Sequence, residues 1–298
     1  MPPAEHEVDA TLVADLVAEQ HPDLRGDAVA FFAEGWDTTL WHLGDDLLVR
    51  LPRREMAVPG LLAEQRWLPE LARSLPLPVP VPVRVGEPGR GFPWHWSIVP
   101  FLGGTPALTG PRMDGARAAS SLAQFLRALH VAAPAGAPRS ALRGVPLSER
   151  ADTFAELYDE LAGEIDAAAV RDAWQEALEA PASVASTWVH GDLHPGNLLV
   201  EDGDLVGVLD FNDLTAGDPA TDLSAAWLLF EDAHVDVLLD AYRPVDGDLV
   251  RRARGWAILF SLLFLSIGRD GREDYAAVGR DGLRRVAAAS RGERGAAS

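Results

Sequence analysis

The sequence changes character about a third of the way along, and this change limits the possible folds more than any other feature. Residues before Leu102-Gly103-Gly104-Thr105-Pro106 contain short apolar runs bounded by turn residues, as is typical of strands. Residues after it place apolar side chains at helical spacing. Clustered glycine and proline end both kinds of structure. The order predicts an α+β fold with a β-rich lobe over residues 1–102 and a mainly helical lobe over residues 103–298.

The first lobe is expected to be a small sheet accompanied by helices. Three apolar runs predict a β-meander, and a later run predicts a further strand. Prolines at positions 76, 78, 80 and 82 exclude a helix there and favour an extended segment that packs as an edge strand. The expected strands are residues 29–33, 38–43, 46–51 and 94–101, the expected helices are 9–20 and 55–75, and the extended segment is 75–85.

The second lobe is expected to be helical with a few short strands. Helices are expected at 115–130, 149–168, 170–180 and through most of 222–289, and strands at 188–190, 198–201 and 205–210. The longest apolar run, residues 256–267, is too short to cross a bilayer and is expected to be a buried core helix. Residues 1–15 carry acids and lack the apolar stretch of a secretory signal. We therefore expect a soluble, cytoplasmic protein with no membrane partner.

Composition narrows the classes of partner. The 298 residues carry a net charge of −19, so a nucleic-acid partner is not expected, because phosphate backbones require a basic surface. The same charge is compatible with a cationic substrate. The chain has no cysteine, which excludes disulfides and thiolate metal sites. All 26 basic residues are arginine, so chemistry that lysine usually performs must fall to arginine.

Three polar blocks follow one another in the second lobe. The first is His190-Gly191-Asp192-Leu193-His194-Pro195-Gly196-Asn197, which matches the Asp-Leu and the Asp-to-Asn spacing of a kinase catalytic loop. In such a loop the Asp reaches the acceptor hydroxyl and the Asn reaches a metal ion under the phosphates. Asp210 follows at the end of an apolar run, where a second metal-binding acid is expected. Gly217-Asp218-Pro219-Ala220-Thr221-Asp222-Leu223 closes the series.

These blocks, H-G-D-L-H-P-G-N, V-L-D-F and G-D-P-A-T-D-L, resemble the aminoglycoside phosphotransferase family, which includes macrolide kinases and other small-molecule kinases. The combined motif spans residues 188–227, and a weaker resemblance covers most of the chain. The resemblance implies a protein-kinase-like, two-lobed fold. It also implies transfer of the γ-phosphoryl group of ATP or GTP to a hydroxyl of a small molecule, with Mg²⁺ as cofactor.

The resemblance assigns expected roles to the second-lobe residues. Asp192 would be the catalytic base for the acceptor hydroxyl, and Asn197 and Asp210 would hold magnesium. Asp222 would support the catalytic loop, and His190 would orient that loop or be an ordinary core histidine. His194 is given no catalytic role.

The nucleotide is expected in the first lobe. Gly35, Thr38 and Thr39 lie between two expected strands, where backbone N–H groups and hydroxyls could contact phosphate oxygens. Arg50 stands where the kinase lysine stands and is expected to pair with Glu64, with Glu55 as second choice. Arg53 and Arg54 are expected to be a solvated pair. The Pro100 carbonyl and the Leu102 N–H are expected to meet the edge of the base.

Two other classes remain open from the sequence. One is a catalytically silent kinase fold that acts as a binding protein, favoured only by arginine in place of lysine. The other is a metal-dependent hydrolase with His190, Asp192 and His194 as ligands. The acceptor is also open: an aminoglycoside-like antibiotic is the first expectation, which would imply antibiotic resistance, and the alternatives are a macrolide, a sugar, homoserine or a choline-like alcohol. Its walls are expected from residues 149–168 and 227–240, which carry several acids.

Overall fold

The chain forms two compact units. The computed structural model describes residues 2–111, 113–183 and 186–296. The first unit consists of Met1–Gly103 together with Val208–Leu214, and the second of Gly104–Gly207 together with Thr215–Ser298. The sequence-based division assigned all of residues 103–298 to one lobe, whereas the short segment 208–214 belongs to the first unit.

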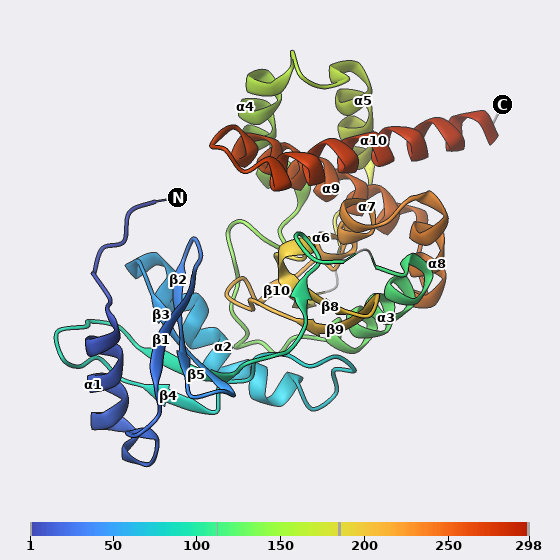
Figure 1. Cartoon of the computed structure of the whole chain (residues 1–298). Helices are drawn as coiled ribbons and strands as arrows, with labels where there is room; N and C mark the ends of the chain where they lie inside the picture. Colours follow the sequence, from blue (N-terminus) through green and yellow to red (C-terminus); the bar gives the residue numbers. More distant parts are fainter. Residues whose placement is uncertain (1, 112, 184–185, 297–298) are drawn as a thin grey trace. The chain divides into compact units, whose positions relative to one another are not determined.

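The first unit is built on a five-stranded antiparallel sheet with the strand order β1-β2-β3-β5-β4 (Figure 1). The strands are β1 (Val29–Glu34), β2 (Thr38–Leu43), β3 (Leu47–Pro52), β4 (Arg84–Gly86) and β5 (Trp96–Pro100). The helices of this unit are α1 (Ala10–Gln20), η1 (Pro22–Leu24), η2 (Glu55–Ala57) and α2 (Val58–Leu71). The β-meander, both helices and the later strand match the sequence prediction.

The two faces of this sheet have different roles. Thr39 pairs with Leu51 and Trp41 with Val49, so their side chains share one face, because side chains alternate along a strand. Val13, Leu16 and Val17 of α1 pack with this face in one buried apolar cluster. Leu40 pairs with Arg50, which places Arg50 on the opposite face. The sheet therefore separates an apolar core from a face that carries a buried cation.

Helix α2 lies close to the segment 208–214. A Cβ atom at Gly60 would lie 2.3 Å from the carbonyl oxygen of Asn212, so only glycine permits this approach. The segment between α2 and β5 is extended, as its prolines require, but its pairing with β5 is limited to residues 84–86 and one bond from the Val83 N–H to the Ile98 carbonyl. Val83 and Val85 are 44% and 50% exposed, so the expected packed strand edge is shorter and more solvated than its apolar alternation suggested.

The second unit is mainly helical, with short strands. Its helices are α3 (Gly115–Leu129), η3 (Leu147–Arg150), α4 (Ala151–Leu161), α5 (Ala167–Glu179), η4 (Pro195–Asn197), α6 (Ala220–Leu223), α7 (Ala225–Leu229), α8 (Asp232–Tyr242), α9 (Gly247–Arg269) and α10 (Glu273–Ala296). Its strands are β6 (Thr105–Pro106), β7 (Thr187–Val189), β8 (Leu198–Glu201), β9 (Asp204–Val208) and β10 (Thr215–Gly217). β7 pairs with β10, and the other three form a sheet in the order β6-β8-β9.

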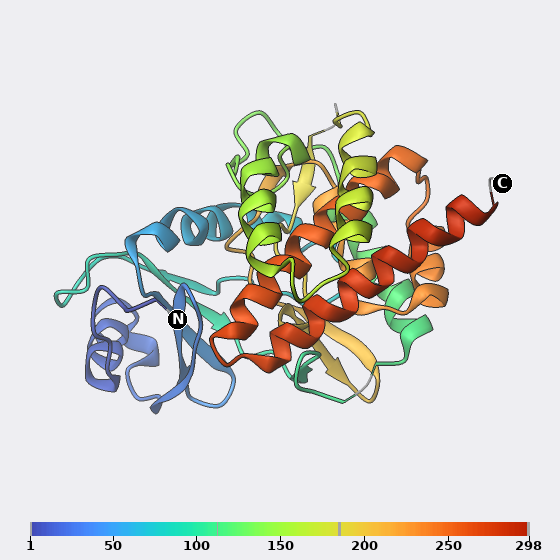
Figure 2. The same cartoon turned by 90° about the horizontal axis from the view of Figure 1, so that it is seen from above.

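Helix α9 is the core of the second unit. It packs against α10 along much of its length and also contacts α4, α5 and α6 (Figure 2). Trp256, Ile258 and Leu262 have no exposed surface, so the apolar run 256–267 is a core helix, as predicted. Within the described ranges no helix has the length and apolar character needed to cross a membrane. The β-rich first unit and helical second unit confirm the α+β fold class.

Candidate active site

The loop that carries Asp192 is anchored to a buried carboxylate. Asp222, on α6, is fully buried, and its two oxygens accept hydrogen bonds from the backbone N–H groups of His190 (2.7 Å) and Gly191 (2.8 Å). Charge-assisted bonds to backbone N–H groups are the stronger kind. They fix the two residues that precede Asp192. Asp222 therefore lies where it contacts the loop backbone directly, next to Asp192.

Asp222 is itself held by His130, which in turn contacts Tyr242, and sequence reasoning found neither residue. His130, which caps the C-terminus of α3, places Nε2 3.0 Å from Asp222 Oδ2 and Nδ1 2.8 Å from the hydroxyl of Tyr242. A carboxylate only accepts, so Nε2 carries the proton, and Nδ1 of the neutral ring accepts from the tyrosine. Burial and the charge of Asp222 raise the pKa of Tyr242, which keeps this donor protonated. His130 and Tyr242 lie in no recognisable motif, so the sequence alone did not indicate them.

The two oxygens of Asp192 have different neighbours. Oδ2 accepts from the amide of Asn197 (3.2 Å) and lies 3.6 Å from His194 Nε2. Oδ1 lies 3.5 Å from a guanidinium nitrogen of Arg143. Burial alone would raise the pKa of Asp192, but contact with His194, followed by the charge of Arg143, holds that pKa well below its usual range. The carboxylate is therefore ionised at neutral pH.

His194 contacts Asp192 through a defined ring nitrogen. Its Nδ1 accepts a hydrogen bond from the Gly196 N–H at 3.0 Å, so in the neutral ring the proton is on Nε2, which faces the carboxylate. A Cβ atom at Gly196 would lie 2.6 Å from the His194 ring, so glycine is required here. From the sequence, His194 was assigned no catalytic role; in the structure it is a direct neighbour of Asp192.

Arg143 is the other neighbour that the sequence did not identify. It lies in an irregular segment between α3 and η3, and its guanidinium stacks over the ring of Phe260 at 4.9 Å. Neither a periodic pattern nor a motif marks this segment. The fold brings Arg143 to Asp192 across about fifty residues of chain.

A second group of polar residues lies in the first unit, around Arg50. Both side chains of the expected pair are buried, and Arg50 donates to the two carboxylate oxygens of Glu64 at 2.7 and 2.8 Å. Burial opposes the charge on Arg50, but the carboxylates of Glu64 and Asp210 hold its pKa above the ordinary value. The other guanidinium nitrogen lies 3.6 Å from Asp210 and 3.4 Å from Asn212. Glu55, the second choice, is exposed and is not the partner.

Asp210 sits in an uncommon backbone conformation. Its φ is +62°, in the left-handed region that non-glycine residues seldom adopt. Its side chain is 45% exposed, and Oδ1 accepts from the Asn212 N–H at 3.4 Å. Strained positions of this kind persist where the surroundings hold them, and they cluster at functional sites. Asp210 is therefore a half-exposed carboxylate beside a buried guanidinium, and Asn212 next to it is also partly exposed.

The turn between β1 and β2 is held by two arginines, which corrects the expectation of a solvated pair. Arg53 is buried; it pairs with Glu34 (2.5 Å) and donates to the carbonyl oxygens of Gly35 (3.0 Å) and Trp36 (3.2 Å). Arg54 pairs with Asp37 at 2.5 Å. The physical reason is strand pairing: the end of β3 lies beside the start of β2, so both arginines reach the turn.

The residues expected to contact the phosphates do not all share one face of the sheet. Thr38 is on the Arg50 face of β2, whereas Thr39, being next along the strand, points to the α1 face and is not placed for a ligand beside Arg50. Pro100 ends β5 opposite Leu47, and Leu102 follows it, half-buried.

An aromatic group near Pro100 was not predicted. Phe32 and Phe101 meet His42 edge-on, with ring centroids 4.7 and 5.2 Å from the histidine, and the two phenylalanine rings are 5.6 Å apart. His42 lies two residues from Leu40, so it shares the Arg50 face of the sheet. These rings could stack on a flat base.

The metal-hydrolase alternative finds no support in the part of the chain that the structure describes. No group of three or more His, Asp and Glu side chains there is arranged to hold a metal ion. His190 Nδ1 instead accepts from the Asp192 backbone N–H at 3.2 Å.

Comparison with known proteins identifies the family of this chain. A model of the phosphotransferase enzyme family matches residues 28–256, which is most of the chain. The chain belongs to this family. It is therefore an enzyme of the small-molecule kinase type, as the catalytic-loop motif indicated. A search of curated proteins gave no match.

Solved structures of similar fold cover nearly the whole phosphotransferase. One is the GDP complex of wild-type aminoglycoside 2′-phosphotransferase-IIIa, 19% identical with a TM-score of 0.68, covering 95% of this chain and 100% of that one. A second is the apoenzyme of macrolide 2′-phosphotransferase MphH from Brachybacterium faecium, 25% identical with a TM-score of 0.61, covering 92% and 97%. A third is the streptomycin–ATP–APH(2″)-IIa ternary complex, 17% identical with a TM-score of 0.61, covering 91% and 96%.

Proposed function

We propose that this phosphotransferase moves the γ-phosphoryl group of ATP or GTP to a hydroxyl of a small molecule, with Asp192 accepting the hydroxyl proton. The observation that carries the proposal is the setting of Asp192: an ionised carboxylate on a loop that Asp222 fixes through two backbone bonds. A loop held in this way presents the carboxylate in one position, and positioning is a large part of phosphoryl-transfer catalysis.

The two carboxylate oxygens of Asp192 have different proposed roles. Oδ2 is held by Asn197 and faces His194, which leaves Oδ1, on the Arg143 side, to accept from the acceptor hydroxyl. A carboxylate with a lowered pKa is a weak base. It therefore orients the hydroxyl early and takes the proton late, which suits the loose transition state of phosphoryl transfer. Arg143 would stabilise negative charge that develops near the attacking oxygen.

The nucleotide is proposed to bind the Arg50 face of the first-unit sheet. Arg50 would contact phosphate oxygens, and Glu64 holds it in place. Thr38 and the backbone of Gly35 would lie along the phosphates. The base would stack near Phe32, His42 and Phe101, with the Pro100 carbonyl accepting and the Leu102 N–H donating at its edge. Relatives of the same fold were solved with GDP, ADP and ATP, which supports a purine nucleotide.

Magnesium is proposed as the cofactor, with Asp210 and Asn197 as ligands. Carboxylate and amide oxygens are ligands that suit this ion, and Asp210 is half-exposed and held by its backbone turn. The Asn197 amide nitrogen donates to Asp192, so its amide oxygen is directed elsewhere. When bound, magnesium neutralises charge on the phosphates.

The acceptor is proposed to be an aminoglycoside-like or other polyhydroxylated molecule. Structures with kanamycin, gentamicin and streptomycin exist for relatives of this fold. The second candidate is a macrolide, because the macrolide phosphotransferase MphH shares 25% identity across the chain. The apolar side chains at the start of the expected wall 227–240 do not add support for a macrolide, because Trp227, Leu228 and Phe230 are buried core residues. The expected acids are partly neutralised, since Glu160 pairs with Arg269 and Glu231 with Arg284 and Arg285.

A coupled nucleotide-consumption assay with a panel of aminoglycosides, macrolides and metabolic alcohols tests the proposal. At least one acceptor should stimulate consumption in the presence of magnesium, and excess chelator should abolish it. In Asp192→Asn the turnover should fall by about 10²–10⁴-fold while nucleotide still binds. Nucleotide binding without turnover on any acceptor would instead support the silent binding protein, and near-normal turnover of Asp192→Asn would remove Asp192 from the mechanism.

A further inference from the structure

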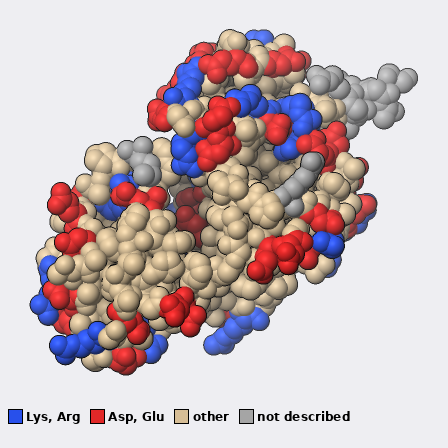
Figure 3. Space-filling view, viewed as in Figure 1, with Lys and Arg blue, Asp and Glu red and all other residues tan. Residues whose placement is uncertain are grey.

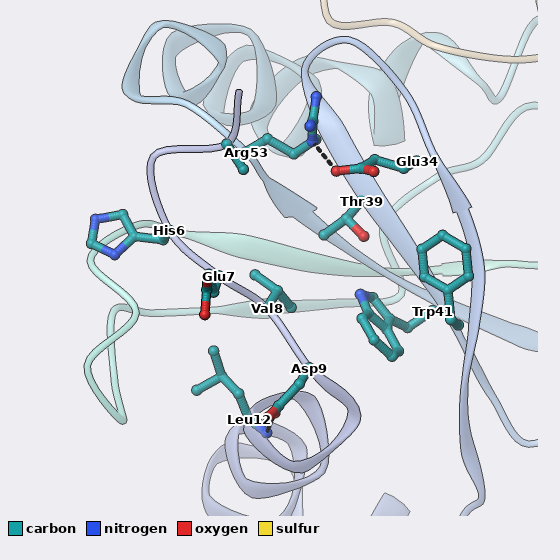
Figure 4. Close-up of a pocket in the computed structure, with 11 residues that line it drawn as sticks. His6, Glu7, Val8, Asp9, Leu12, Glu34, Thr39, Trp41 and Arg53 are labelled. Atoms are coloured by element: carbon teal, nitrogen blue, oxygen red, sulfur yellow. Dashed lines mark hydrogen bonds and ion pairs between the residues drawn. The ribbon is translucent and has the colours of Figure 1, made fainter. Parts of the chain in front are cut away.

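A cavity of about 570 Å³ opens on the α1 side of the first-unit sheet, away from Arg50 (Figure 4). The N-terminal segment before α1 forms one wall, and strands β1 and β2 form the other. The cavity belongs entirely to the first unit, and none of its lining residues other than Thr39 was expected to bind a ligand. Its volume is in the range of small-molecule sites.

The floor of the cavity is aromatic. Phe31 and Trp41 meet edge-on, with ring centroids 5.4 Å apart. Phe31 is 57% exposed, so its ring is accessible to a ligand in the cavity. Val8 and Leu12 complete an apolar wall (Figure 4). Aromatic faces in this arrangement attract organic cations.

A buried donor without a partner also points to a ligand. Trp41 is only 7% exposed, and its indole Nε1–H is buried with no hydrogen-bond partner among the described residues. Its nitrogen-bearing edge lies on the side of Val8 and Thr39 (Figure 4). An unsatisfied buried N–H is costly, so an acceptor supplied from the cavity would be favourable.

The charged side chains that line the cavity determine whether a cation or an anion is favoured. Glu7, Asp9 and Glu34 line the cavity, against a single guanidinium, that of Arg53, which already pairs with Glu34. Asp9 also caps α1 by accepting from the Leu12 N–H at 2.8 Å. The remaining charge is negative, so a cation is favoured and an anion is repelled.

We propose that this cavity binds a small organic ammonium ion with an aromatic body that carries an oxygen acceptor. The ring packs between Phe31, Val8 and Leu12, the oxygen accepts from Trp41 Nε1–H, and the ammonium group faces Glu7 and Asp9. This site is separate from the proposed nucleotide face, because Thr39 and Trp41 point away from Arg50.

The cavity is also connected to the β1–β2 turn. Arg53 lines it and, through the same guanidinium, holds the carbonyl oxygens of Gly35 and Trp36. A ligand that fills the cavity would restrict the Arg53–Glu34 pair, which also lines it, and would stabilise the held form of this turn. If the turn contacts nucleotide phosphates, which rests on the proposed function, the ligand strengthens nucleotide binding, and the nucleotide strengthens ligand binding equally.

Calorimetry on the full chain with four matched probes tests the site without any nucleotide. Tyramine has the cation, ring and oxygen; phenethylamine lacks the oxygen; 4-ethylphenol lacks the charge; 4-hydroxyphenylacetate reverses it. Tyramine should bind best, and the neutral and anionic probes should bind about tenfold weaker or not at all. Equal binding of tyramine and the anion, or no binding of tyramine, would overturn the proposal.

Variants locate the binding and control for folding. Trp41→Phe should weaken tyramine but leave phenethylamine unchanged, and retained phenethylamine binding shows that the fold is intact. Glu7→Gln should weaken tyramine, whereas Glu70→Gln, an equal charge change at an exposed position outside the cavity, should not. Equal effects of the two glutamate variants would overturn the site.

The link to the turn has its own measurement. Saturating tyramine should tighten binding of a non-hydrolysable nucleotide by about fivefold. Unchanged nucleotide affinity would overturn the link, and the four-probe result would still decide the site independently of whether the enzyme is a kinase.

Discussion

At the scale of single residues, the pKa of Asp192 depends on His194, a motif residue that was expected to have no catalytic role. The contact lowers the pKa of Asp192, so the carboxylate persists to lower pH than an ordinary aspartate, whose pKa is about 3.9. The lowered pKa also sets how Asp192 contributes to folding stability as the pH changes. A lowered folded-state pKa adds stability that is present above the ordinary pKa and is lost as the pH falls towards the folded-state value.

Removing His194 should therefore shift the loss of activity at acidic pH to a higher pH. In His194→Ala the pKa of Asp192 rises, so kcat/KM should begin to fall at a pH about one unit higher than in the wild type. The pH profile of kcat/KM checks this, with His95→Ala, an exchange in the first unit, as the control. A profile that only scales down, without moving, would show that His194 is structural.

The Arg50–Glu64 pair allows stability to be separated from nucleotide binding. Arg50→Ala leaves Glu64 buried and unpaired, so unfolding free energy should fall by about 3–5 kcal/mol. The double variant Arg50→Met/Glu64→Leu should regain most of that stability, yet its KM for nucleotide should stay raised. Thermal melts and nucleotide titrations check both points. A double variant with normal nucleotide KM would exclude Arg50 from the nucleotide site.

Whether a site residue could be predicted from the sequence depends on how far along the chain it lies from the residues that it contacts. Asp192, Asn197 and Asp222 lie in one motif, and Arg50 and Glu64 belong to neighbouring elements, so motif resemblance could single them out as candidates. His130, Tyr242 and Arg143 come from distant segments, and only the fold brings them to the loop. Thr39 was grouped with the turn although it lies inside the strand expected over 38–43, where side chains alternate between the two faces.

At the scale of elements, the catalytic loop is connected to α8 and α3 through a hydrogen-bonded series. Tyr242 donates to His130, His130 donates to Asp222, and Asp222 accepts from the loop backbone. Each member satisfies the next in a buried setting, so loss of one leaves another unsatisfied. The series makes the loop position depend on two helices that do not belong to the motif.

His130→Ala should cost about 1–3 kcal/mol of unfolding free energy and lower kcat, because Asp222 loses a donor. Tyr242→Phe should cost about 1 kcal/mol and lower kcat less. Tyr158→Phe is the matched control: it removes a similar hydrogen bond, to the Ala167 carbonyl, that has no connection with the loop. Equal kcat changes in the two tyrosine variants would show a general stability effect.

Elements were mostly predictable because their patterns are local. Apolar runs located β1, β2, β3 and β5, and helical spacing located α1, α3 and α9. Strands β6 and β10 are too short to leave a pattern. Residues 75–83 alternate in apolar character as a strand would, but their prolines lack the N–H groups that pairing needs.

At the scale of the whole molecule, charge is the dominant property. The net charge is −19, but acids and arginines are interspersed on the face shown in Figure 3, and many of the acids are paired. Interspersed charges favour solubility over steering by one strongly negative surface. The general acidity therefore gives less support to a cationic acceptor than the sequence alone suggested.

Salt dependence decides this point. If the preferred acceptor is cationic and its site is acidic, its KM should rise several-fold from low to high ionic strength while kcat changes little. Initial rates on a cationic and a neutral acceptor across a salt series provide the measurement. A preferred acceptor that is neutral, with a KM independent of salt, would assign the acidity to solubility alone.

The arginine at position 50 also decides which reagents can report on the proposed nucleotide site. Electrophilic nucleotide probes that acylate the strand lysine of kinases need a free amine, and a guanidinium stays protonated and reacts poorly. Dicarbonyl reagents do attack arginine, but Arg50 is buried against Glu64 and is shielded until that pair opens. In amine-directed profiling of nucleotide-binding enzymes this protein would therefore go undetected while fully able to hold its nucleotide.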